Sequence, residues 1–268
     1  LLSQDYAKYC FTNKKTFIDL GADFRLESEE EYKKWYGGEF KYAKVHQAAV
    51  YALPELFREN IIGSNIIANP GCYPTSVALG LAPLVANKLV DCTDILIDAK
   101  SGVTGAGRGL SQNTHFPDCN ESFAPYKIGE HRHTPEIEQI LEKLCDSLVS
   151  VTFVPHLLPV NRGILSTMYT NPIANIDIEE IYKLYTDFYE KEQFVRVMDI
   201  GETANIKNTV YSNYCDISLH KDRHSGKIII VSALDNMVKG AAGQAVQNMN
   251  IVCGFEEILG LDFVPPAF

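Results

Sequence analysis

The sequence predicts an α/β protein, with a parallel sheet in the front part of the chain and a strand-rich α+β region with a mixed or antiparallel sheet behind it. Three observations lead to this prediction. Strand-like runs alternate with helical patterns at the front, several strand-like runs follow between about residues 90 and 232, and a helix rich in glycine and alanine closes the chain. Alternating strands and helices are typical of parallel sheets, whereas runs of strands are typical of α+β folds. Two domains that share one cleft are the simplest arrangement.

The front of the chain begins with a helical pattern and then alternates between strands and helices. A polar helix rich in Glu and Lys is expected to be a solvated face rather than a site. The predicted elements are a helix over 3–11, a strand over 15–21, the polar helix over 27–37, a strand over 64–69 and an apolar helix over 74–89.

The rest of the chain contains most of the predicted strands. In the helix predicted over 134–148, Thr134 can serve as N-cap, Pro135 suits the first helical position, and Glu136 lies in the first turn, where the helix dipole favours a carboxylate. The other elements are strands over 94–101, 150–160 and 163–171, a helix over 177–192, strands over 194–199, 214–222 and 227–234, and a helix over 238–254.

The composition of the chain excludes several classes of protein. With 268 residues, 46% of them hydrophobic, the chain can bury a large core. Its formal charge of -10 argues against nucleic-acid binding, and it has no run of about 18 apolar residues that would span a membrane. Seven scattered cysteines without a Cys-x-x-Cys pair disfavour a disulfide framework and a zinc site. We therefore expect an intracellular protein, cytoplasmic or, in a eukaryote, organellar.

Cys72 stands in the segment Asn69-Pro70-Gly71-Cys72, between a predicted strand and a predicted helix. A thiol at the start of a helix lies near the positive end of the helix dipole, which stabilises a thiolate and lowers its pKa. Gly71 allows a sharp turn, and Pro70 restricts the residue before it to an extended conformation. The alternative is a buried, inert thiol, since free cysteine is among the most buried residue types. Cys72 is therefore a candidate nucleophile.

A nucleophilic thiol needs a proton-transfer partner, and His131 and His133 are the candidates. Both precede a predicted helix N-terminus, whose positive end disfavours the imidazolium and keeps the ring neutral as a base. A histidine that hydrogen-bonds the loop backbone is the plain alternative. The His-x-His pair also resembles half a metal site, but no further ligand is suitably spaced, so we expect no metal.

A glycine-dense loop from Ser101 to Gly109 follows the strand predicted over 94–101. The loop matches neither the Walker A motif nor the dinucleotide-binding Gly-x-Gly-x-x-Gly pattern. Its glycines allow close approach to a flat ring or a phosphate, and Arg108 can supply a fixed charge; a mobile loop with a solvated arginine is the alternative. Arg162 lies between two predicted strands, where it can meet an anionic group or form an ion pair across a subunit contact.

Seven segments of the chain together resemble one family. They occur in the order found in that family and extend from about Thr16 to Leu261. The segments are IDLGADFRL, YALPEL, NPGCYPT, DAKSGVTGAGR, HRHTPEIEQ, PHLLPVNRGIL and LDNMVKGAAGQAVQNMN. On these motifs the chain resembles the N-acetyl-gamma-glutamyl-phosphate reductases of the semialdehyde dehydrogenase superfamily.

The resemblance implies an oxidoreductase of arginine biosynthesis. This activity is the NADPH-dependent reduction of N-acetyl-gamma-glutamyl phosphate to the semialdehyde through a cysteine thioester. The family's nucleophile falls on Cys72, and its acid/base on His133, with His131 as the alternative. The remaining expected contacts are to the cofactor NADP(H) at Ser101, Gly102, Gly105 and Asn236, and to the substrate at Asn69, Arg108 and Arg162.

The resemblance also implies two domains and self-association. We expect residues 1–72 and 233–268 to form part of a Rossmann-like dinucleotide-binding domain, and 73–232 to form a catalytic and dimerisation domain of a dimer or tetramer. Family members begin with a strand, a glycine-rich phosphate turn and a helix, and this chain does not. We therefore expect a truncated, processed or incompletely represented chain that binds NADPH poorly or not at all.

Three alternatives to this assignment stay open. Two are related reductases, which act on N-acetyl-aminoadipyl phosphate or aspartyl phosphate. The third is a thiol enzyme or binding module without a cofactor.

Overall fold

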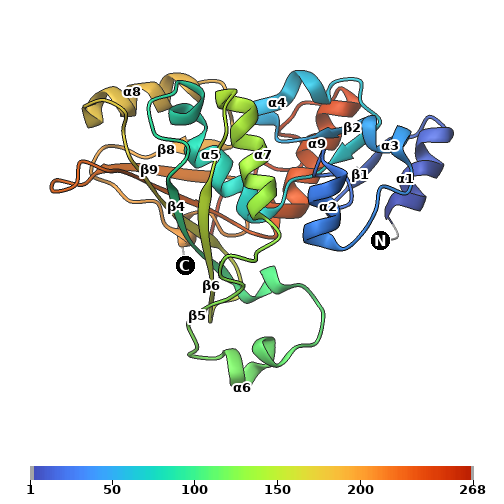
Figure 1. Ribbon diagram of the computed structural model, residues 1–268, viewed down its shortest axis with the longest axis horizontal. Helices are drawn as coiled ribbons and strands as arrows, with labels where there is room; N and C mark the ends of the chain where they lie inside the picture. The colour runs from blue at the N-terminus through green and yellow to red at the C-terminus, as the bar shows by residue number, and fades with distance from the viewer. Residues whose placement is uncertain (1–2, 267–268) are drawn as a thin grey trace.

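The computed structural model describes residues 3–266, which form two β-sheets with helices packed around them (Figure 1). The smaller sheet is parallel, with strand order β1-β3-β2, and in its register Ile66 lies opposite both Phe17 and Ala49. The central strand is fully buried, which explains its uninterrupted apolar sequence. The three strands are β1 (Phe17–Asp19), β2 (Ala49–Tyr51) and β3 (Ile66–Ala68).

Helices from both halves of the chain surround the small sheet. The last helix, α9, packs against α4 and β1, so the end of the chain returns to the sheet formed by its front. A π-helical turn, η4 (Val238–Ala242), comes directly before α9. The helices of this region are α1 (Ser3–Thr12), α2 (Glu29–Tyr36), α3 (Ala43–Gln47), α4 (Pro54–Ile61) and α9 (Gly243–Cys253).

The larger sheet is mixed and has seven strands in the order β5-β6-β4-β7-β10-β9-β8. β4 is parallel to β6 and β8 is parallel to β9, whereas the other neighbouring pairs are antiparallel. The strands are β4 (Ile95–Gly102), β5 (Ala124–Pro125), β6 (Val151–Leu158), β7 (Ile164–Thr170), β8 (Val195–Val197), β9 (Cys215–Lys221) and β10 (Ile228–Leu234).

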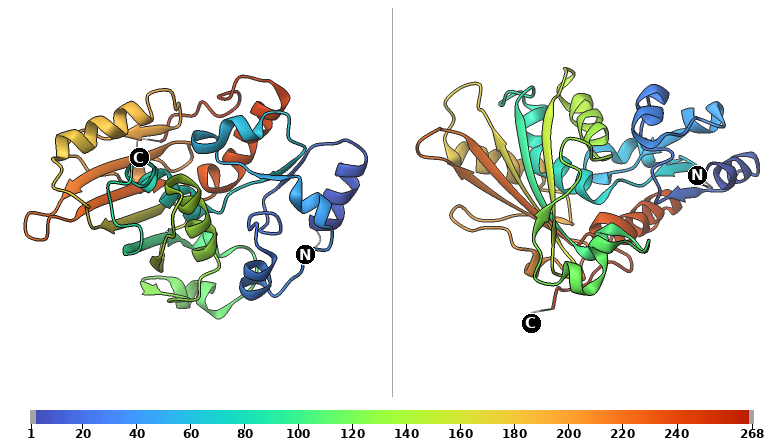
Figure 2. Two further views of the ribbon diagram at one scale, coloured as in Figure 1. Left: turned by 45° about the horizontal axis from the view of Figure 1, so that its top comes forward. Right: turned by 60° about the horizontal axis from the view of Figure 1, so that its bottom comes forward.

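Three helices, α5 (Cys72–Ala86), α7 (Thr134–Cys145) and α8 (Ile178–Phe188), pack on the large sheet, while the small-sheet region lies to one side of it (Figure 2). α5 contacts β7 and β10 as well as both other helices, and it is buried along almost its whole length. A Cβ at Gly80 would lie 2.4 Å from Met168 Cε, so any side chain there would displace the end of the Met168 side chain. Because β3 leads directly into α5, the first residue of this helix lies where the two sheets join.

A long excursion, which we call the arm (residues 103–123), leaves the end of β4 and returns through β5. Figure 1 shows it extending beyond the rest of the molecule. It contains only short elements, η1 (Val103–Ala106), η2 (Gln112–Thr114) and α6 (Phe116–Cys119). Large apolar side chains are exposed on it at Leu110, Phe116 and Phe123.

The predicted fold class is confirmed, because a parallel sheet formed by the front of the chain stands beside a mixed sheet formed by the strand-rich region. One detail is wrong: Thr134 is the first residue of α7, and His133 occupies the N-cap position without a side-chain hydrogen bond. The division into domains at residues 72 and 233 stays a prediction. Within residues 3–266, no helix has the length and apolar character needed to cross a bilayer.

Candidate active site

The turn between β3 and α5 carries Cys72 as the first helical residue, with Gly71 as N-cap. Asn69, which is 1% exposed, fixes the start of this turn. Its Nδ2 donates to the carbonyl of Ala241 at 3.1 Å, and its Oδ1 accepts from Asn248 Nδ2 at 3.0 Å. The amide that was predicted to contact substrate therefore holds the turn against the last helix of the chain.

Glycine is required at two positions beside Cys72. A Cβ at Gly71 would lie 2.7 Å from His133 Nε2 and 2.9 Å from Arg25 Nη1, so a side chain there would displace both. A Cβ at Gly240, in the π-helical turn, would lie 2.7 Å from Cys72 Cβ. Cys72 thus lies in a tightly packed environment, with a cation and an imidazole next to the residue that precedes it.

His131 and His133 lie side by side, and the backbone N–H of His133 donates to His131 Nδ1 at 3.1 Å. This bond leaves the proton of a neutral His131 ring on Nε2. Burial, reinforced by Lys127 and Arg132, lowers the pKa of His131 to about 4. Burial, followed by the charges of His131 and Arg25, also lowers the pKa of His133 well below the ordinary histidine value. Both rings are therefore neutral near pH 7, and His133 Nε2 lies beside the Cys72 turn.

The Cys72 thiol does not have the lowered pKa predicted from its position on the helix. Burial raises the pKa of Cys72 to about 11, although the nearby charge of Arg25 acts in the opposite direction. The helix-dipole prediction is wrong because desolvation of a thiolate outweighs the favourable charges around it. At neutral pH the sulfur therefore carries its proton.

Arg25 and Glu136 belong to this site, and sequence reasoning gave neither of them a role in it. Arg25 Nε donates to the carbonyl of Asn69 at 2.8 Å, and its Nη2 donates to that of Leu20 at 2.9 Å. Glu136 Oε1 accepts from the backbone N–H of Gly71 at 2.8 Å. The sequence did contain a signal for Arg25. It is a cation a few residues after a predicted strand of a parallel sheet, and ligands of parallel sheets bind near the carboxyl ends of the strands.

The residues predicted to contact the cofactor lie together at the end of β4. Asn236 Nδ2 donates to Thr104 Oγ1 at 3.0 Å, and its Oδ1 accepts from the backbone N–H of Gly163 at 2.8 Å. A Cβ at Gly105 would lie 2.6 Å from Ser101 Oγ and 3.7 Å from Asn236 Nδ2. The structure thus brings Ser101, Gly102, Gly105 and Asn236 into one cluster, in which Gly105 packs so close to Ser101 Oγ that a side chain there would meet it.

The two arginines predicted to contact substrate have different surroundings. Arg162 Nη1 pairs with Asp235 Oδ2 at 3.3 Å within the same chain, and its guanidinium stacks on Tyr211 at 4.8 Å. Arg108 is exposed in the arm. Neither lines the cleft described next.

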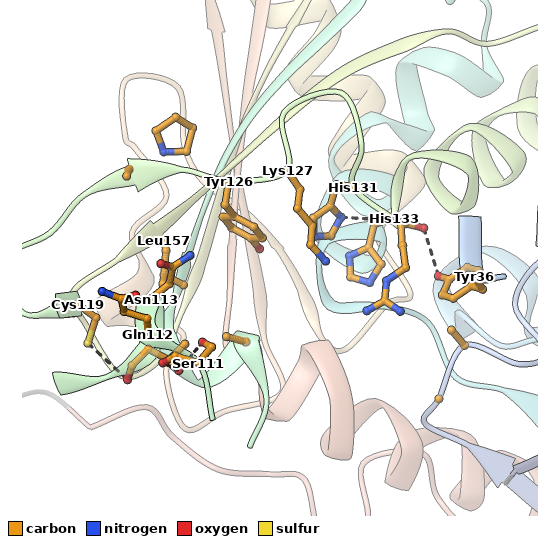
Figure 3. A pocket seen from close by; sticks show the side chains of 18 of the residues that line it. Tyr36, Ser111, Gln112, Asn113, Cys119, Tyr126, Lys127, His131, His133 and Leu157 are labelled. Carbon is orange, nitrogen blue, oxygen red and sulfur yellow. Dashed lines mark hydrogen bonds between the residues drawn. The ribbon is translucent and has the colours of Figure 1, made fainter. Parts of the chain in front are cut away.

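A cleft of about 1000 Å³ separates the arm from the small-sheet region (Figure 3). Figure 3 shows Lys127, His131 and His133 close together, with Tyr36 beyond them. Arg132 stacks on Tyr36 at 5.3 Å, and the Tyr36 hydroxyl donates to its carbonyl at 3.2 Å. Three cations, Arg25, Lys127 and Arg132, line the cleft. Cys72 does not line it, although Arg25 and His133, next to the Cys72 turn, do.

Comparison with known proteins identifies the family. A sequence model described as the semialdehyde dehydrogenase dimerisation domain matches residues 72–236. An N-acetyl-gamma-glutamyl-phosphate reductase of Clostridium botulinum (strain Eklund 17B) is 58% identical over 267 residues, which are 100% of this chain and 78% of that protein. The chain belongs to the N-acetyl-gamma-glutamyl-phosphate reductase family. Another relative with that name, from Brachyspira hyodysenteriae, is 57% identical over 275 residues and covers the same shares of both proteins.

Solved structures of the superfamily agree with the fold of this reductase family member. Aspartate semialdehyde dehydrogenase II from Vibrio cholerae has a TM-score of 0.70 at 19% identity, over 98% of this chain and 77% of that one. Aspartate semialdehyde dehydrogenase with NADP from Candida albicans has a TM-score of 0.65 at 15% identity, over 93% and 74% of the two chains. At these identities the likeness concerns the fold alone.

Proposed function

We propose that the chain reduces N-acetyl-gamma-glutamyl phosphate to N-acetyl-glutamate semialdehyde in arginine biosynthesis. The names of relatives at 57–58% identity support this substrate. The observation that carries the chemistry is the thiol of Cys72 at the start of α5, with Arg25 and the neutral His133 packed against the glycine before it. A cysteine suits the reaction because its thioester stays reactive toward reduction.

The first step joins the Cys72 sulfur to the acyl carbon of the substrate. His133 Nε2 accepts the thiol proton, the sulfur adds to the carbonyl carbon, and the carbon–oxygen bond to the phosphate breaks, leaving an acyl thioester on Cys72. His133 suits this role because its lowered pKa keeps the ring neutral and its Nε2 lies beside Gly71. His131 helps to position His133, because its Nδ1 accepts a hydrogen bond from the backbone N–H of His133.

The anionic groups of the substrate meet the cations that line the cleft. The substrate carries a carboxylate and a phosphate, and Lys127 and Arg132 offer exposed positive charge near the two histidines. These two residues suit substrate binding better than Arg162, which is paired with Asp235, or Arg108, which lies outside the cleft. Asn69 contributes by holding the Cys72 turn.

The cofactor NADP(H) supplies the hydride for the reduction. Ser101, Gly102, Gly105 and Asn236 would hold its nicotinamide end, because they lie together at the end of β4 and the glycines let the backbone come close to a flat group. A Candida albicans superfamily structure with NADP agrees with this cofactor. The choice between NADPH and NADH is tested by comparing the two in the same assay.

Self-association and location follow from the same family. We propose a homo-oligomer, a dimer or tetramer that associates through the large-sheet region, and the name of the domain that matches residues 72–236 supports it. We also propose that the enzyme works in the cytoplasm, or in an organelle of a eukaryote. Sedimentation of the purified protein tests the first point, and a stable monomer would contradict it.

The function is tested with the purified protein. Loss of the reduced-nicotinamide absorbance is followed with N-acetyl-gamma-glutamyl phosphate, N-acetyl-aminoadipyl phosphate, aspartyl phosphate and a simple ester. Oxidation of the cofactor that is fastest with the first substrate supports the proposal. Faster oxidation with another acyl phosphate would change the substrate, and ester cleavage without cofactor would replace the reductase by a thiol hydrolase.

A further inference from the structure

Glu136 is a carboxylate buried at the junction of the two sheets. It lies in the first turn of α7 and is 0% exposed. Its Oε1 accepts two hydrogen bonds, from the backbone N–H of Gly71 at 2.8 Å and from the Tyr51 hydroxyl at 2.9 Å. Its Oε2 lies 3.4 Å from Arg25 Nη1. A buried carboxylate with this many donors is held firmly, since each bond offsets part of its desolvation.

The three partners of Glu136 come from different strands of the small sheet. Tyr51 is the last residue of β2, Gly71 follows β3, and Arg25 lies in the loop after β1. Glu136 itself belongs to α7, which packs on α5 and the large sheet. A single side chain therefore ties the carboxyl ends of three parallel strands to a helix of the other sheet.

The same helix start carries the proposed base. His133 is the N-cap of α7, three residues before Glu136, and its Nε2 would be 2.7 Å from a Cβ at Gly71. The Gly71 N–H bond of Glu136 and the position of His133 thus belong to one rigid helical turn. Movement of Glu136 relative to Gly71 would change the separation of Cys72 from His133.

The charges of Glu136 and Arg25 also act on Cys72, in opposite directions. The positive charge of Arg25 lowers the pKa of the thiol, and the carboxylate of Glu136 raises it. The titratable groups that face this pair are Tyr36 from α2, Tyr51, His133 and Cys72. Glu136 balances the guanidinium, so it limits how strongly Arg25 favours the thiolate.

We propose that Glu136 is a positioning residue of the active site, which holds the Cys72 turn and Arg25 against the helix start that carries His133. Its carboxylate bonds to Gly71, Tyr51 and Arg25, and it does not line the cleft. This inference rests on the proposed function, in which Cys72 is the nucleophile and His133 the base.

The test compares Glu136→Gln with Glu138→Gln in the complete protein. The first variant keeps an acceptor oxygen for Gly71 and Tyr51 but removes the charge that faces Arg25. Glu138 is the matched control, because it lies on the same helix and also accepts a backbone N–H, that of Val151 at 3.1 Å, away from the site. Two quantities are measured: kcat and KM for the acyl phosphate, and the pH dependence of Cys72 alkylation by iodoacetamide, followed by peptide mass spectrometry.

For Glu136→Gln we expect kcat to fall about 100-fold with little change in KM, because a small displacement of reacting groups has an effect of this order. We also expect the midpoint of Cys72 alkylation to move to lower pH, because Arg25 is then unbalanced. Glu138→Gln should change neither quantity. Unchanged kcat and alkylation in Glu136→Gln, or equal losses in both variants, would overturn the proposal.

Two further measurements keep the test decisive. If Glu136→Gln does not fold, Tyr51→Phe removes a single hydroxyl from the carboxylate and should lower kcat in the same direction by a smaller factor; an unchanged kcat would overturn the proposal. Alkylation needs no substrate, so a shifted midpoint in a protein without reductase activity would keep the positioning role and reject the proposed function.

Discussion

The turn that carries Cys72 and the arm across the cleft are built in opposite ways. The turn is buried and is held by residues far apart in the sequence: Arg25 and Asn248 both bond to Asn69, and Glu136 bonds to Gly71. The arm is exposed beyond η1, and its side-chain bonds there join near neighbours, such as His115 Nδ1 to Asp118 Oδ2 at 3.1 Å. The turn therefore offers a fixed geometry, whereas the arm contributes surface to the cleft.

The largest difference between the two regions is expected when one cysteine of each, Cys72 in the turn or Cys119 in the arm, is replaced by alanine. Cys72→Ala should abolish turnover, because no other sulfur is placed beside Arg25 and His133 among the described residues, and the fold should survive since the side chain is small. Cys119 lines the cleft from the arm, and Cys119→Ala should leave turnover unchanged. Steady-state rates and circular dichroism check both; equal losses in the two variants would remove the distinction between turn and arm.

The next effect concerns the histidines. His133→Ala should lower kcat by about 100-fold to 10,000-fold, the usual contribution of a general base. Because the pKa of His133 is lowered, the ring stays neutral as pH falls through the ordinary histidine range, and activity should decline only at more acidic pH. His115→Ala, in the arm, is the control and should keep the wild-type pH profile. A wild-type rate that already falls with a midpoint at the ordinary histidine pKa would contradict the burial of His133.

A smaller effect is expected from added methyl groups. Gly71→Ala forces a Cβ to within 2.7 Å of His133 Nε2, so it should lower the free energy of unfolding by about 1–3 kcal/mol and reduce kcat. Gly109→Ala, in the arm, meets no heavy atom within 4 Å and should change stability by less than about 0.5 kcal/mol. Denaturant unfolding of both variants measures the difference. Similar losses in the free energy of unfolding would show that the turn accommodates an added methyl group as readily as the arm.

The smallest effect is expected at the apolar surface of the arm. Phe116 is 74% exposed, so Phe116→Ser should change the free energy of unfolding by less than about 0.5 kcal/mol. Leu79→Ala, in α5, removes a fully buried side chain and should cost about 2–5 kcal/mol. Thermal unfolding compares them. A large loss in Phe116→Ser would mean that the arm packs against another surface in solution.

The sequence predicted the parts of this molecule that depend on local pattern. The strand-turn-helix around Cys72 and the paired histidines before α7 are short motifs, so their elements were found in the right order. The prediction of a lowered pKa for Cys72 was wrong. Its position at the start of a helix can be seen in the local sequence, whereas its burial depends on the packing of α5 against η4.

Long-range partners could not be read from local pattern. Glu136 looked like an ordinary first-turn acid of a helix, and nothing nearby in the sequence indicates that it bonds to Gly71, 65 residues away. Arg25 likewise meets Asn69 only when two parallel strands align. Such contacts follow from topology, which sets strand neighbours and helix packing together.

The central claim is that the Cys72 sulfur carries the acyl group while His133 takes its proton. The most direct measurement mixes the complete protein with N-acetyl-gamma-glutamyl phosphate without reduced cofactor, quenches it in acid and maps the acyl adduct by peptide mass spectrometry. We predict an adduct on Cys72 that forms much more slowly in His133→Ala. An adduct on another residue, or equal rates in both proteins, would contradict the account.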